Sequence, residues 1–484
     1  MRNTLIALFL LLATFSVNAR VNIDGCLKGN PDLRGAYVGV LAVTADGDTL
    51  ACHNADALFV PASNMKLVTV ASALKYLGAE YRYETKIAVS GKIKDGTLHG
   101  NVYIVGGGDP TTAYPDSPER LFASWAEILA DSGIKRIEGK IVGDGSSFSG
   151  MKESPDWLFA DIGTYYGTGV TGLQFAGNTL NLNVVPGPYP GSPLEITQVF
   201  PLTPWIDLVY DCTTGEKGTG DQLYLYTTDF ARTAILRGTF AAGKKPKTVR
   251  CSNKYPELTC AKEFYDFLSK SGLYVEGYDQ GKAPADASIL GTTVSSPLKD
   301  IVVPLMRDSD NFLAETIFRT LGKERLDDDR YESSVKAETM ILESAGVTGL
   351  RDIVIDDGSG LSPNNLVSPA FLCRLLHTML GKEPSGAFLN SLPVAGVNGT
   401  VASFLPDLPD EVRHRIHLKS GSHTGVRNYS GYYFPENGSP VIFSVMINHG
   451  TASGQKLSSA AGEIISSIVT GTGFIRTGGQ SVSR

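Results

Sequence analysis

A serine and a lysine lie three residues apart, as Ser63 and Lys66, in the segment FVPASNMKLV (residues 59–68). The apolar pattern that follows predicts a helix, and residues three apart share a helix face, so the Lys66 amine can reach the Ser63 hydroxyl. A serine hydroxyl becomes a useful nucleophile when a base takes its proton, and lysine is such a base once burial or a nearby cation lowers its pKa. The alternative is structural, with Ser63 as a helix cap and the Lys66 stem lying along apolar surface. Taken alone, these two residues favour the structural interpretation.

The spacing itself is not specific, because the same Ser-x-x-Lys pattern begins at six other serines. These are Ser72, Ser132, Ser149, Ser296, Ser333 and Ser453. Their surroundings predict a helix interior, turns, caps or an exposed charged helix. Ser63 differs because a strand-like approach and Pro61 lead directly into a strongly apolar helical pattern. Context therefore selects Ser63 from among these serines.

A second group of polar residues, Ser309-Asp310-Asn311, opens another helical pattern. The Ser309 hydroxyl is suited to relay a proton to a leaving group. The Asn311 amide is suited to bind both a lysine and a substrate carbonyl. The alternative is again a helix cap, formed by Ser309 or Asp310.

A third group is Lys419-Ser420-Gly421-Ser422, at the end of a strand-like run. An earlier Lys-Ser-Gly match at 270–272 ends an amphipathic helix, so its glycine is expected to be a helix C-cap. In the later match, a glycine in a strand lets another backbone or a substrate approach closely. Lys419 and Ser420 then offer a cation and a hydroxyl to a carboxylate.

The backbone also offers groups that suit acyl transfer. The N–H groups of Ser63 and Ser422 are natural donors to an oxyanion, because each belongs to a segment that must come close to the reacting carbonyl. A helix N-terminus at Ser63 additionally favours negative charge developing there.

The order of the three groups identifies a resemblance. Ser-x-x-Lys on a first helix, Ser-x-Asn in a middle helical region and Lys-Ser-Gly on a late strand form the set found in serine acyltransferases that bind penicillin. The chain resembles the low-molecular-mass penicillin-binding proteins of the D-alanyl-D-alanine carboxypeptidase/endopeptidase type (class C, peptidase family S13). The resemblance covers most of the chain. It includes the segments 107–111, 357–362 and 393–400, and a long insertion between the first two groups that class A β-lactamases and simpler carboxypeptidases lack.

The resemblance implies a reaction and a role for each group. Ser63 would be acylated by a peptidoglycan stem peptide ending in D-Ala-D-Ala, or by a β-lactam antibiotic acting as inhibitor, and Lys66 would be the general base. The remaining roles are proton transfer and substrate positioning by Ser309 and Asn311, and binding of the substrate carboxylate by Lys419 and Ser420. Water would then release the acyl group. No cofactor and no metal are implied.

An aspartate and an aromatic residue five positions later help such relatives to read the free amino end of the stem side chain. Asp161 and Tyr166 match that spacing inside the insertion. The alternative for this pair is a turn aspartate and a core tyrosine. Three positions depart from the family pattern. The usual Lys-Thr-Gly-Thr is Lys-Ser-Gly-Ser here, which keeps the hydroxyl groups, and Asn398 stands where an aspartate is common.

The elements that must position these residues are predicted as α+β. Two strands at 36–43 and 49–52 form a hairpin, and a helix follows at 64–77. Later helices are predicted at 298–306, 311–321, 331–345 and 369–380, then strands at 416–419, 429–434 and 441–448 and a last helix at 454–468. We expect the first hairpin and the last strands to share one antiparallel sheet flanked by helices, as in the penicillin-binding and serine β-lactamase-like transpeptidase domain.

The catalytic domain is therefore expected to be split, into 20–83 and 296–484. Residues 84–295 alternate short strands with Gly, Pro and Asn turns, and they predict an inserted β-rich region of two subdomains. Predicted strands there are 85–89, 98–105, 136–142, 181–185 and 221–227, with helices at 118–132 and 261–271.

The N-terminus predicts export. A positive charge at Arg2, an apolar run at 5–13 and the small-residue ending Val17-Asn18-Ala19 indicate a signal peptide over 1–19. The mature chain is expected in the periplasm or cell envelope, without a transmembrane anchor, because no later segment is long and apolar enough.

Composition restricts the partners and the kinds of site. The net charge is −7, without a basic cluster, which argues against nucleic acid. The absence of Cys-x-x-Cys and His-x-x-x-His pairs argues against zinc. An exported chain can oxidise cysteines, so one disulfide is expected among Cys212, Cys251 and Cys260, whereas Cys373 is expected to be a buried thiol.

Two other functions remain as alternatives. One is a β-lactamase or esterase on the same fold, and the other is a peptidoglycan-binding protein that has lost catalysis. The large insertion and the lack of an obvious deacylating glutamate motif weigh against a class A β-lactamase. The intact set of three groups weighs against a silent binding protein. The balance between carboxypeptidase and endopeptidase activity stays open.

Overall fold

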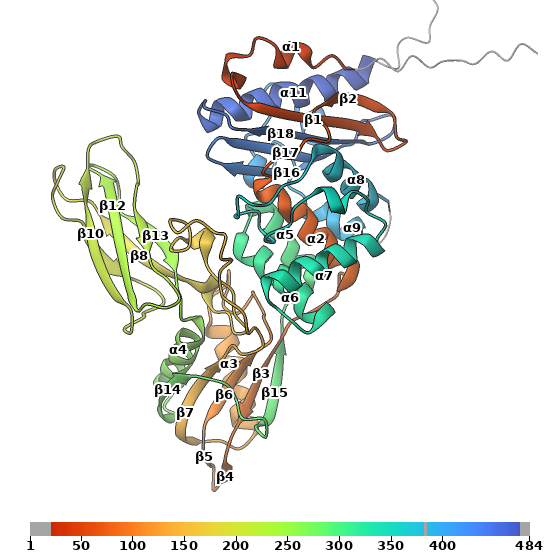
Figure 1. The fold of residues 1–484 in the computed structure, drawn as a ribbon. Coiled ribbons are helices and arrows are strands. Elements are labelled where there is room, and N and C mark those ends of the chain that lie inside the picture. Colours follow the sequence, from red (N-terminus) through yellow and green to blue (C-terminus); the bar gives the residue numbers. More distant parts are fainter. Residues whose placement is uncertain (1–20, 382–384, 475–484) are drawn as a thin grey trace, which may run out of the picture.

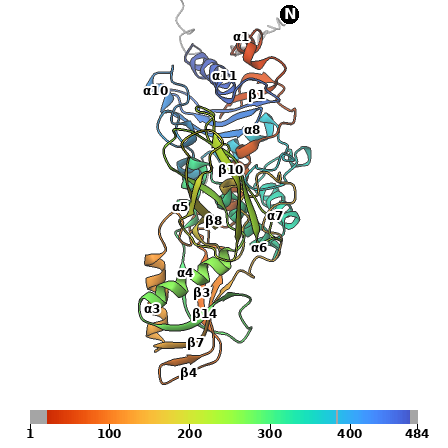
Figure 2. The same cartoon turned by 90° about the vertical axis from the view of Figure 1, so that its left-hand side faces the viewer.

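The structure is a computed structural model that describes residues 21–381 and 385–474. The predicted signal peptide at 1–19 lies outside the described residues, as does the end of the predicted catalytic domain at 475–484. Figures 1 and 2 show a helix-covered sheet that carries both ends of the described chain, with two β-rich parts extending away from it.

A five-stranded antiparallel sheet joins the two ends of the chain, in the order β16-β17-β18-β1-β2. Its strands are β1 (Tyr37–Thr44), β2 (Thr49–His53), β16 (Ile416–His423), β17 (Val426–Tyr433) and β18 (Val441–Asn448). The register between first and last strands runs from Tyr37 opposite Asn448 to Thr44 opposite Val441. The predicted shared sheet is confirmed.

Both faces of this sheet are covered, so its central strand is buried on both sides. Successive side chains of a strand face opposite ways. In β18, Phe443 and Val445 therefore join the core under helix α11 (Gly454–Phe474), while Ile442 and Met446 join the core on the other face. Helix α8 (Pro369–Met379) lies on that second face.

The rest of the second face is a cluster of helices, visible in Figure 1 below the sheet. Its members are α2 (Met65–Tyr76), α5 (Leu298–Asp308), α6 (Asn311–Leu326), α7 (Tyr331–Ser344) and α9 (Ser385–Ser391). Short helices α1 (Asp24–Leu27) and α10 (Asp410–Arg413) flank the sheet. Helix α2 is almost entirely buried and ends before Gly78, whose φ of +86° suits a glycine C-cap.

The first β-rich part is a sheet with the order β15-β3-β6-β7-β5-β4, in which β14 also pairs with β7. Its elements are β3 (Glu84–Val89), β4 (Lys92–Lys94), β5 (Thr97–His99), β6 (Val102–Gly106), β7 (Arg136–Asp144), β14 (Tyr274–Gln280), β15 (Ser288–Val294), α3 (Glu119–Asp131) and α4 (Pro256–Lys270). Trp125 and Phe264 pack between the helices and this sheet. The chain leaves the helical cluster through β3 and returns to it through β15. Glu84 of β3 pairs with Val294 of β15 at the end of the two strands that lies next to the helical cluster.

The second β-rich part consists of two three-stranded sheets, with the orders β13-β8-β9 and β10-β12-β11. Their strands are β8 (Thr179–Val185), β9 (Glu195–Gln198), β10 (Asp207–Gly215), β11 (Tyr224–Tyr226), β12 (Thr233–Ala241) and β13 (Lys247–Ser252). Leu182 and Leu236 lie in one small core that draws on both sheets.

The structure corrects two sequence predictions in this region. The single strand predicted at 98–105 is two strands, β5 and β6. They are separated at Gly100, where φ is +156° and a Cβ would lie 2.1 Å from the Ser90 carbonyl oxygen. Strands such as β9 and β10 were not predicted, because their side chains are mostly exposed or half-buried and give a weak apolar alternation.

The expected disulfide is also not formed. All six cysteines lie in described parts of the chain and are free thiols. Cys260 belongs to the core under α4, whereas Cys251 is buried in the small core of the second β-rich part and Cys212 packs against that core. Cys373 is a buried thiol, as predicted. Among residues 21–381 and 385–474, no helix has the length and apolar character needed to span a bilayer.

Candidate active site

Ser63 lies in a 3₁₀ turn, η2 (Ala62–Asn64), directly before α2. The sheet holds this turn tightly. Asn428 of β17 donates from Nδ2 to the carbonyl oxygens of Val60 and Pro61, both at 2.9 Å. Strand β16 lies so close that a Cβ on Gly421 would be 2.5 Å from the Pro61 carbonyl oxygen. The close approach expected at Gly421 is therefore real, and the approaching backbone is the turn that carries Ser63.

Lys66 is fully buried, and its ammonium group faces three oxygens. Its Nζ donates to Ser63 Oγ at 3.0 Å, to Asn311 Oδ1 at 2.6 Å and to the Ser359 carbonyl oxygen at 2.6 Å. An amide oxygen and a backbone carbonyl can only accept. When Lys66 is neutral, its two hydrogens therefore go to Asn311 and Ser359, and its lone pair points at the Ser63 hydroxyl.

Burial also makes the neutral form accessible. Removal from water disfavours the ammonium and lowers the pKa of Lys66 to about 8, against the opposing attraction of Asp357, Glu315 and Asp310. A base with a pKa near neutrality combines a substantial unprotonated fraction with useful basicity.

Ser309 and Asn311 lie at the junction of α5 and α6. Ser309 ends α5 in the left-handed region, with φ of +59°, and Asp310 caps α6 by accepting from the Leu313 N–H at 3.0 Å. The helix cap of the alternative interpretation is thus Asp310, and it leaves its two neighbours free to turn toward the lysines. Asn311 is oriented by its amide nitrogen, which donates to the Tyr166 carbonyl oxygen at 2.8 Å.

Lys419 is the second fully buried lysine of the cluster. Its Nζ donates to Ser309 Oγ at 2.9 Å and to the Ser420 carbonyl oxygen at 2.7 Å. Burial, and secondarily the charge of Lys66, hold the pKa of Lys419 well below its usual range. The Ser420 hydroxyl shares a 2.7 Å hydrogen bond with that of Thr400, and Ser422 lies exposed on the same strand.

Asp161 and Tyr166 form a pair at the edge of this cluster. The Tyr166 hydroxyl donates to Asp161 Oδ1 at 3.1 Å, and burial raises the pKa of Tyr166 to about 12, so the hydroxyl keeps its proton. Asp161 remains partly exposed. Tyr166 reaches the lysines only through its backbone carbonyl on Asn311. The nine predicted site residues thus fall into one region of the described structure, although Asp161, Tyr166 and Ser422 form no hydrogen bond with either lysine.

Comparison with known proteins identifies the family of this chain. The model of the family described as "D-Ala-D-Ala carboxypeptidase 3 (S13) family" matches residues 19–467. The chain belongs to the S13 family. A D-alanyl-D-alanine carboxypeptidase from Actinomadura sp. is 30% identical over 89% of this chain and 80% of its own length. The D-alanyl-D-alanine carboxypeptidase DacB of Haemophilus influenzae is 26% identical over 92% of both chains.

Solved structures show the same fold. The crystal structure of penicillin binding protein 4 (dacB) from Haemophilus influenzae superposes with a TM-score of 0.81 at 23% identity, covering 92% of this chain and 98% of that one. The same protein in complex with a β-lactam gives 0.76 at 22% identity. These findings confirm the predicted family resemblance and the α+β transpeptidase-like fold with extra β structure. They also confirm the assignment to the serine-type D-Ala-D-Ala carboxypeptidases, which are hydrolases.

The segment 357–362 of this S13 protein contributed to the resemblance, but no role was predicted for it from the sequence. Its Asp357 accepts from the N–H groups of Gly360 and Ser362, both at 2.7 Å, and from Trp157 Nε1 at 2.8 Å. These bonds hold a tight loop whose Ser359 carbonyl binds Lys66. Every residue has a backbone carbonyl, so residue type could not identify Ser359 as a partner of Lys66. The sequence indicated this loop only through its run of polar and small residues between two helices.

The segment 393–400 also supports the site. Asn398, where the family commonly has aspartate, accepts from the Val394 N–H at 3.0 Å, so the amide oxygen does the work of a carboxylate oxygen. That turn presents Thr400 to Ser420. The segment 393–400 therefore shapes the end of the site that contains Ser420.

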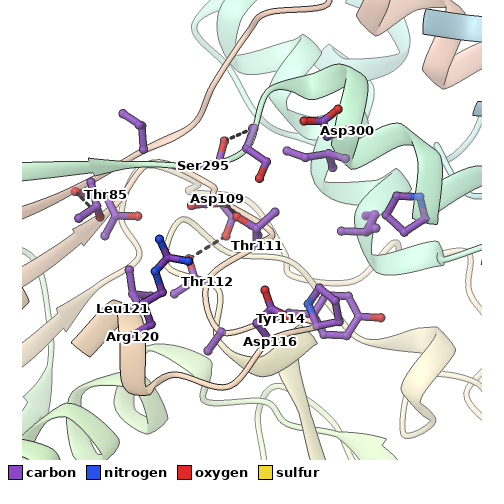
Figure 3. Close-up of a pocket in the computed structure, with 18 of the residues that line it drawn as sticks. Thr85, Asp109, Thr111, Thr112, Tyr114, Asp116, Arg120, Leu121, Ser295 and Asp300 are labelled. Carbon is purple, nitrogen blue, oxygen red and sulfur yellow. Dashed lines mark hydrogen bonds between the residues drawn. The ribbon is translucent and has the colours of Figure 1, made fainter. Parts of the chain in front are cut away.

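A cavity of about 710 Å³ has Asp310 among its lining residues, and Figure 3 shows this cavity. Asp300 of α5 stands on one side and Arg120 of α3 on the other, so it separates the helical cluster from the first β-rich part. The Tyr114 hydroxyl donates to Asp310 Oδ2 at 2.5 Å. Of the described residues that line it, none is a predicted site residue, and it is separate from the cluster around Ser63.

Proposed function

We propose that this chain hydrolyses peptidoglycan stem peptides ending in D-Ala-D-Ala through an acyl-enzyme on Ser63, and that β-lactams acylate the same serine. One observation carries the assignment: Lys66 bonds Ser63 Oγ while its other two partners can only accept. A buried amine in that arrangement directs its lone pair at one hydroxyl.

In the acylation step, Lys66 takes the Ser63 hydroxyl proton as Oγ attacks the carbonyl carbon of the penultimate D-alanine. The N–H groups of Ser63 and Ser422 stabilise the oxyanion. The C–N bond then breaks, and the departing D-alanine amine receives the proton through Lys66 and Ser309. Water next attacks the ester with Lys66 again as base, which releases the shortened peptide and restores Ser63.

The cations and hydroxyls of β16 bind the substrate's terminal carboxylate. Lys419 and Ser420 supply an ammonium and a hydroxyl, and Thr400 orients the latter. Asn311 holds the amide of the bound peptide while it holds Lys66. Asp161, with Tyr166, binds the free amine of the stem side chain. In this proposal the catalytic domain comprises 20–83 and 296–484, and the inserted region 84–295 supplies the Asp161 pair.

Labelling with a fluorescent penicillin tests the nucleophile. We expect one covalent label on the wild type and none on Ser63→Ala. Ser132→Ala is the matched control, because Ser132 has the same Ser-x-x-Lys spacing but bonds the Ile128 carbonyl at the end of α3. Absence of label on the wild type, or equal label on Ser63→Ala, would contradict the assignment.

Further assays separate the alternatives. Rapid release of hydrolysed β-lactam would favour a β-lactamase, and a stable label without any product from stem peptides would favour a binding protein. Digestion of cross-linked and uncross-linked muropeptides distinguishes endopeptidase from carboxypeptidase. The proposed periplasmic or cell-envelope location rests on residues 1–19, and N-terminal sequencing of the exported protein should give a start near Arg20.

A further inference from the structure

The orientation of the Lys66 amine depends on where the Ser359 carbonyl oxygen stands. Asn311 Oδ1 and Ser359 O take the two hydrogens of the neutral amine, so moving either acceptor turns the lone pair away from Ser63. Asn311 is fixed by its own helix and by Tyr166. Ser359 belongs to a loop, so something must hold its peptide group in place.

Glu315 makes that contact. Its Oε1 accepts from the Ser359 N–H at 2.7 Å, and Ser359 passes the constraint through its own carbonyl to Lys66 at 2.6 Å. Glu315 lies four residues after Asn311 on α6, so the two side chains leave the same helix face. A single turn of α6 thus holds both acceptors of the Lys66 amine.

The surroundings of Glu315 explain how it can do this beside a base. The side chain is fully buried, and burial together with Asp357 raises the pKa of its carboxyl well above the usual range. The groups that face it are Lys66, Asp357 and the hydroxyl of Tyr331 on α7. Among the described residues, Glu315 Oε2 and the Tyr331 hydroxyl have no hydrogen-bond partner.

We propose that Glu315 is a positioning residue for catalysis, which fixes the Ser359 carbonyl and thereby aims the lone pair of Lys66 at Ser63. It touches neither substrate nor the reacting atoms. Its Oε1 supplies an acceptor to the Ser359 N–H, and burial disfavours the charged form of this carboxyl beside Lys66. An ionised carboxylate there would favour the ammonium and reduce the fraction of usable base. This inference rests on the proposed role of the Ser63–Lys66 pair.

Two substitutions at Glu315 separate acceptor from charge. Glu315→Gln keeps an oxygen for the Ser359 N–H and is neutral, so acylation by benzylpenicillin should proceed near the wild-type rate with an unchanged pH profile. Glu315→Leu keeps the volume but removes the acceptor. We expect its second-order acylation rate to fall about 10- to 100-fold, because a misplaced base loses alignment with its nucleophile. Its kcat should fall while KM for a D-Ala-D-Ala peptide changes little.

The control is Glu338→Leu. Glu338 is another fully buried carboxyl, on α7, whose pKa burial raises to about 8, but no hydrogen bond links it to Ser359. Replacing it should change the melting temperature and leave the acylation rate and pH profile near wild type. A Glu315→Leu protein that melts cooperatively and acylates at the wild-type rate overturns the inference.

Three further results are decisive. If Glu315→Leu does not fold, Glu315→Gln still decides the matter, because a large loss of rate or a shifted pH profile in that variant overturns the role of a neutral acceptor. If the wild type itself takes no label from penicillin, the proposed function fails. If the wild type is labelled and every Glu315 variant is acylated at the wild-type rate, the inference about Glu315 is wrong, while the proposed function still stands.

Discussion

Lys66 and Lys419 share one buried cluster, and among the described residues no carboxylate is hydrogen-bonded to either lysine. Lys66 donates only to neutral oxygens, and so does Lys419. Burial disfavours the charged form of both lysines, and the charge of Lys66 further disfavours the ammonium of Lys419. An arriving carboxylate changes this balance at Lys419, because opposite charge at short range favours the ammonium.

Substrate binding should therefore take up a proton. At a pH between the low pKa of Lys419 in the free enzyme and its higher pKa beside a carboxylate, binding converts neutral Lys419 to the cation. Titration calorimetry of Ser63→Ala with a D-Ala-D-Ala peptide, in two buffers of different ionisation enthalpy, measures this uptake. Lys419→Met in the same background should abolish it, and equal binding heats in both buffers would contradict it.

The pH dependence of acylation should follow Lys66. The competent base is the neutral amine, so the competent fraction grows as the pH rises toward about 8 and levels off above it. Below that value the second-order rate of β-lactam acylation should rise about tenfold per pH unit. Lys66→Arg, which stays charged, should lose about 10²- to 10⁴-fold at every pH. A flat wild-type profile between pH 6 and 8 would rule out this role.

At the scale of elements, the site is assembled by close contact between β16 and the η2 turn. Gly421 permits that contact, since a Cβ there would lie 2.5 Å from the Pro61 carbonyl oxygen. Gly421→Ala should push the strand and the turn apart, at a cost of about 1–3 kcal/mol in unfolding free energy. It should also slow acylation, because Ser63 and Lys419 lie on the two separated segments.

Gly277→Ala is the matched control for that substitution. Gly277 also lies in a strand, β14, and a Cβ there would meet nothing within 4 Å. Differential scanning calorimetry and penicillin labelling should show little change for Gly277→Ala and losses in both for Gly421→Ala. If the two variants lose the same stability and the same labelling rate, the close contact between β16 and the η2 turn is not what the site depends on.

Sequence patterns predicted the elements that are apolar and regular, and the side chains that act by type. Helix α2, strand β18 and the residues Ser63, Lys66 and Lys419 belong to this class. The supports escaped prediction because they act through backbone or through burial. Ser359 contributes a carbonyl that any residue has, and Glu315 looked like one more polar position on a helix. Strands β9 and β10 were not predicted for a related reason. They bury few side chains, so their sequences show no clear alternation of apolar and polar residues.

At the scale of the whole molecule, the insertion reaches into the site through one loop. Tyr166 binds Asn311 through its carbonyl, and Lys254 donates to the Ile162 carbonyl oxygen at 2.6 Å, which holds the same loop from behind. The inserted region is therefore tied to the catalytic cluster and presents Asp161 beside it.

Asp161→Asn should separate recognition from chemistry. It removes a negative charge that would bind a substrate amine, so kcat/KM should fall for stem peptides with a free side-chain amine. The rate for peptides acetylated at that amine, and the rate of penicillin acylation, should stay near wild type. Kinetics with the matched peptide pair checks this, and an equal loss for both peptides would contradict a charge-reading role.

The pairing of β1 with β18 has a consequence for time as well as for space. The hairpin of β1 and β2 is synthesised early, together with the η2 turn that carries Ser63. Strand β18, which pairs with β1, is synthesised about four hundred residues later. The intervening β-rich parts have their own cores and can form while the first segment waits. The nucleophile therefore stays without Lys419 until the last strands arrive. In the proposed mechanism, we therefore expect no acylation of Ser63 before the strands β16 to β18 have been made and have paired with β1.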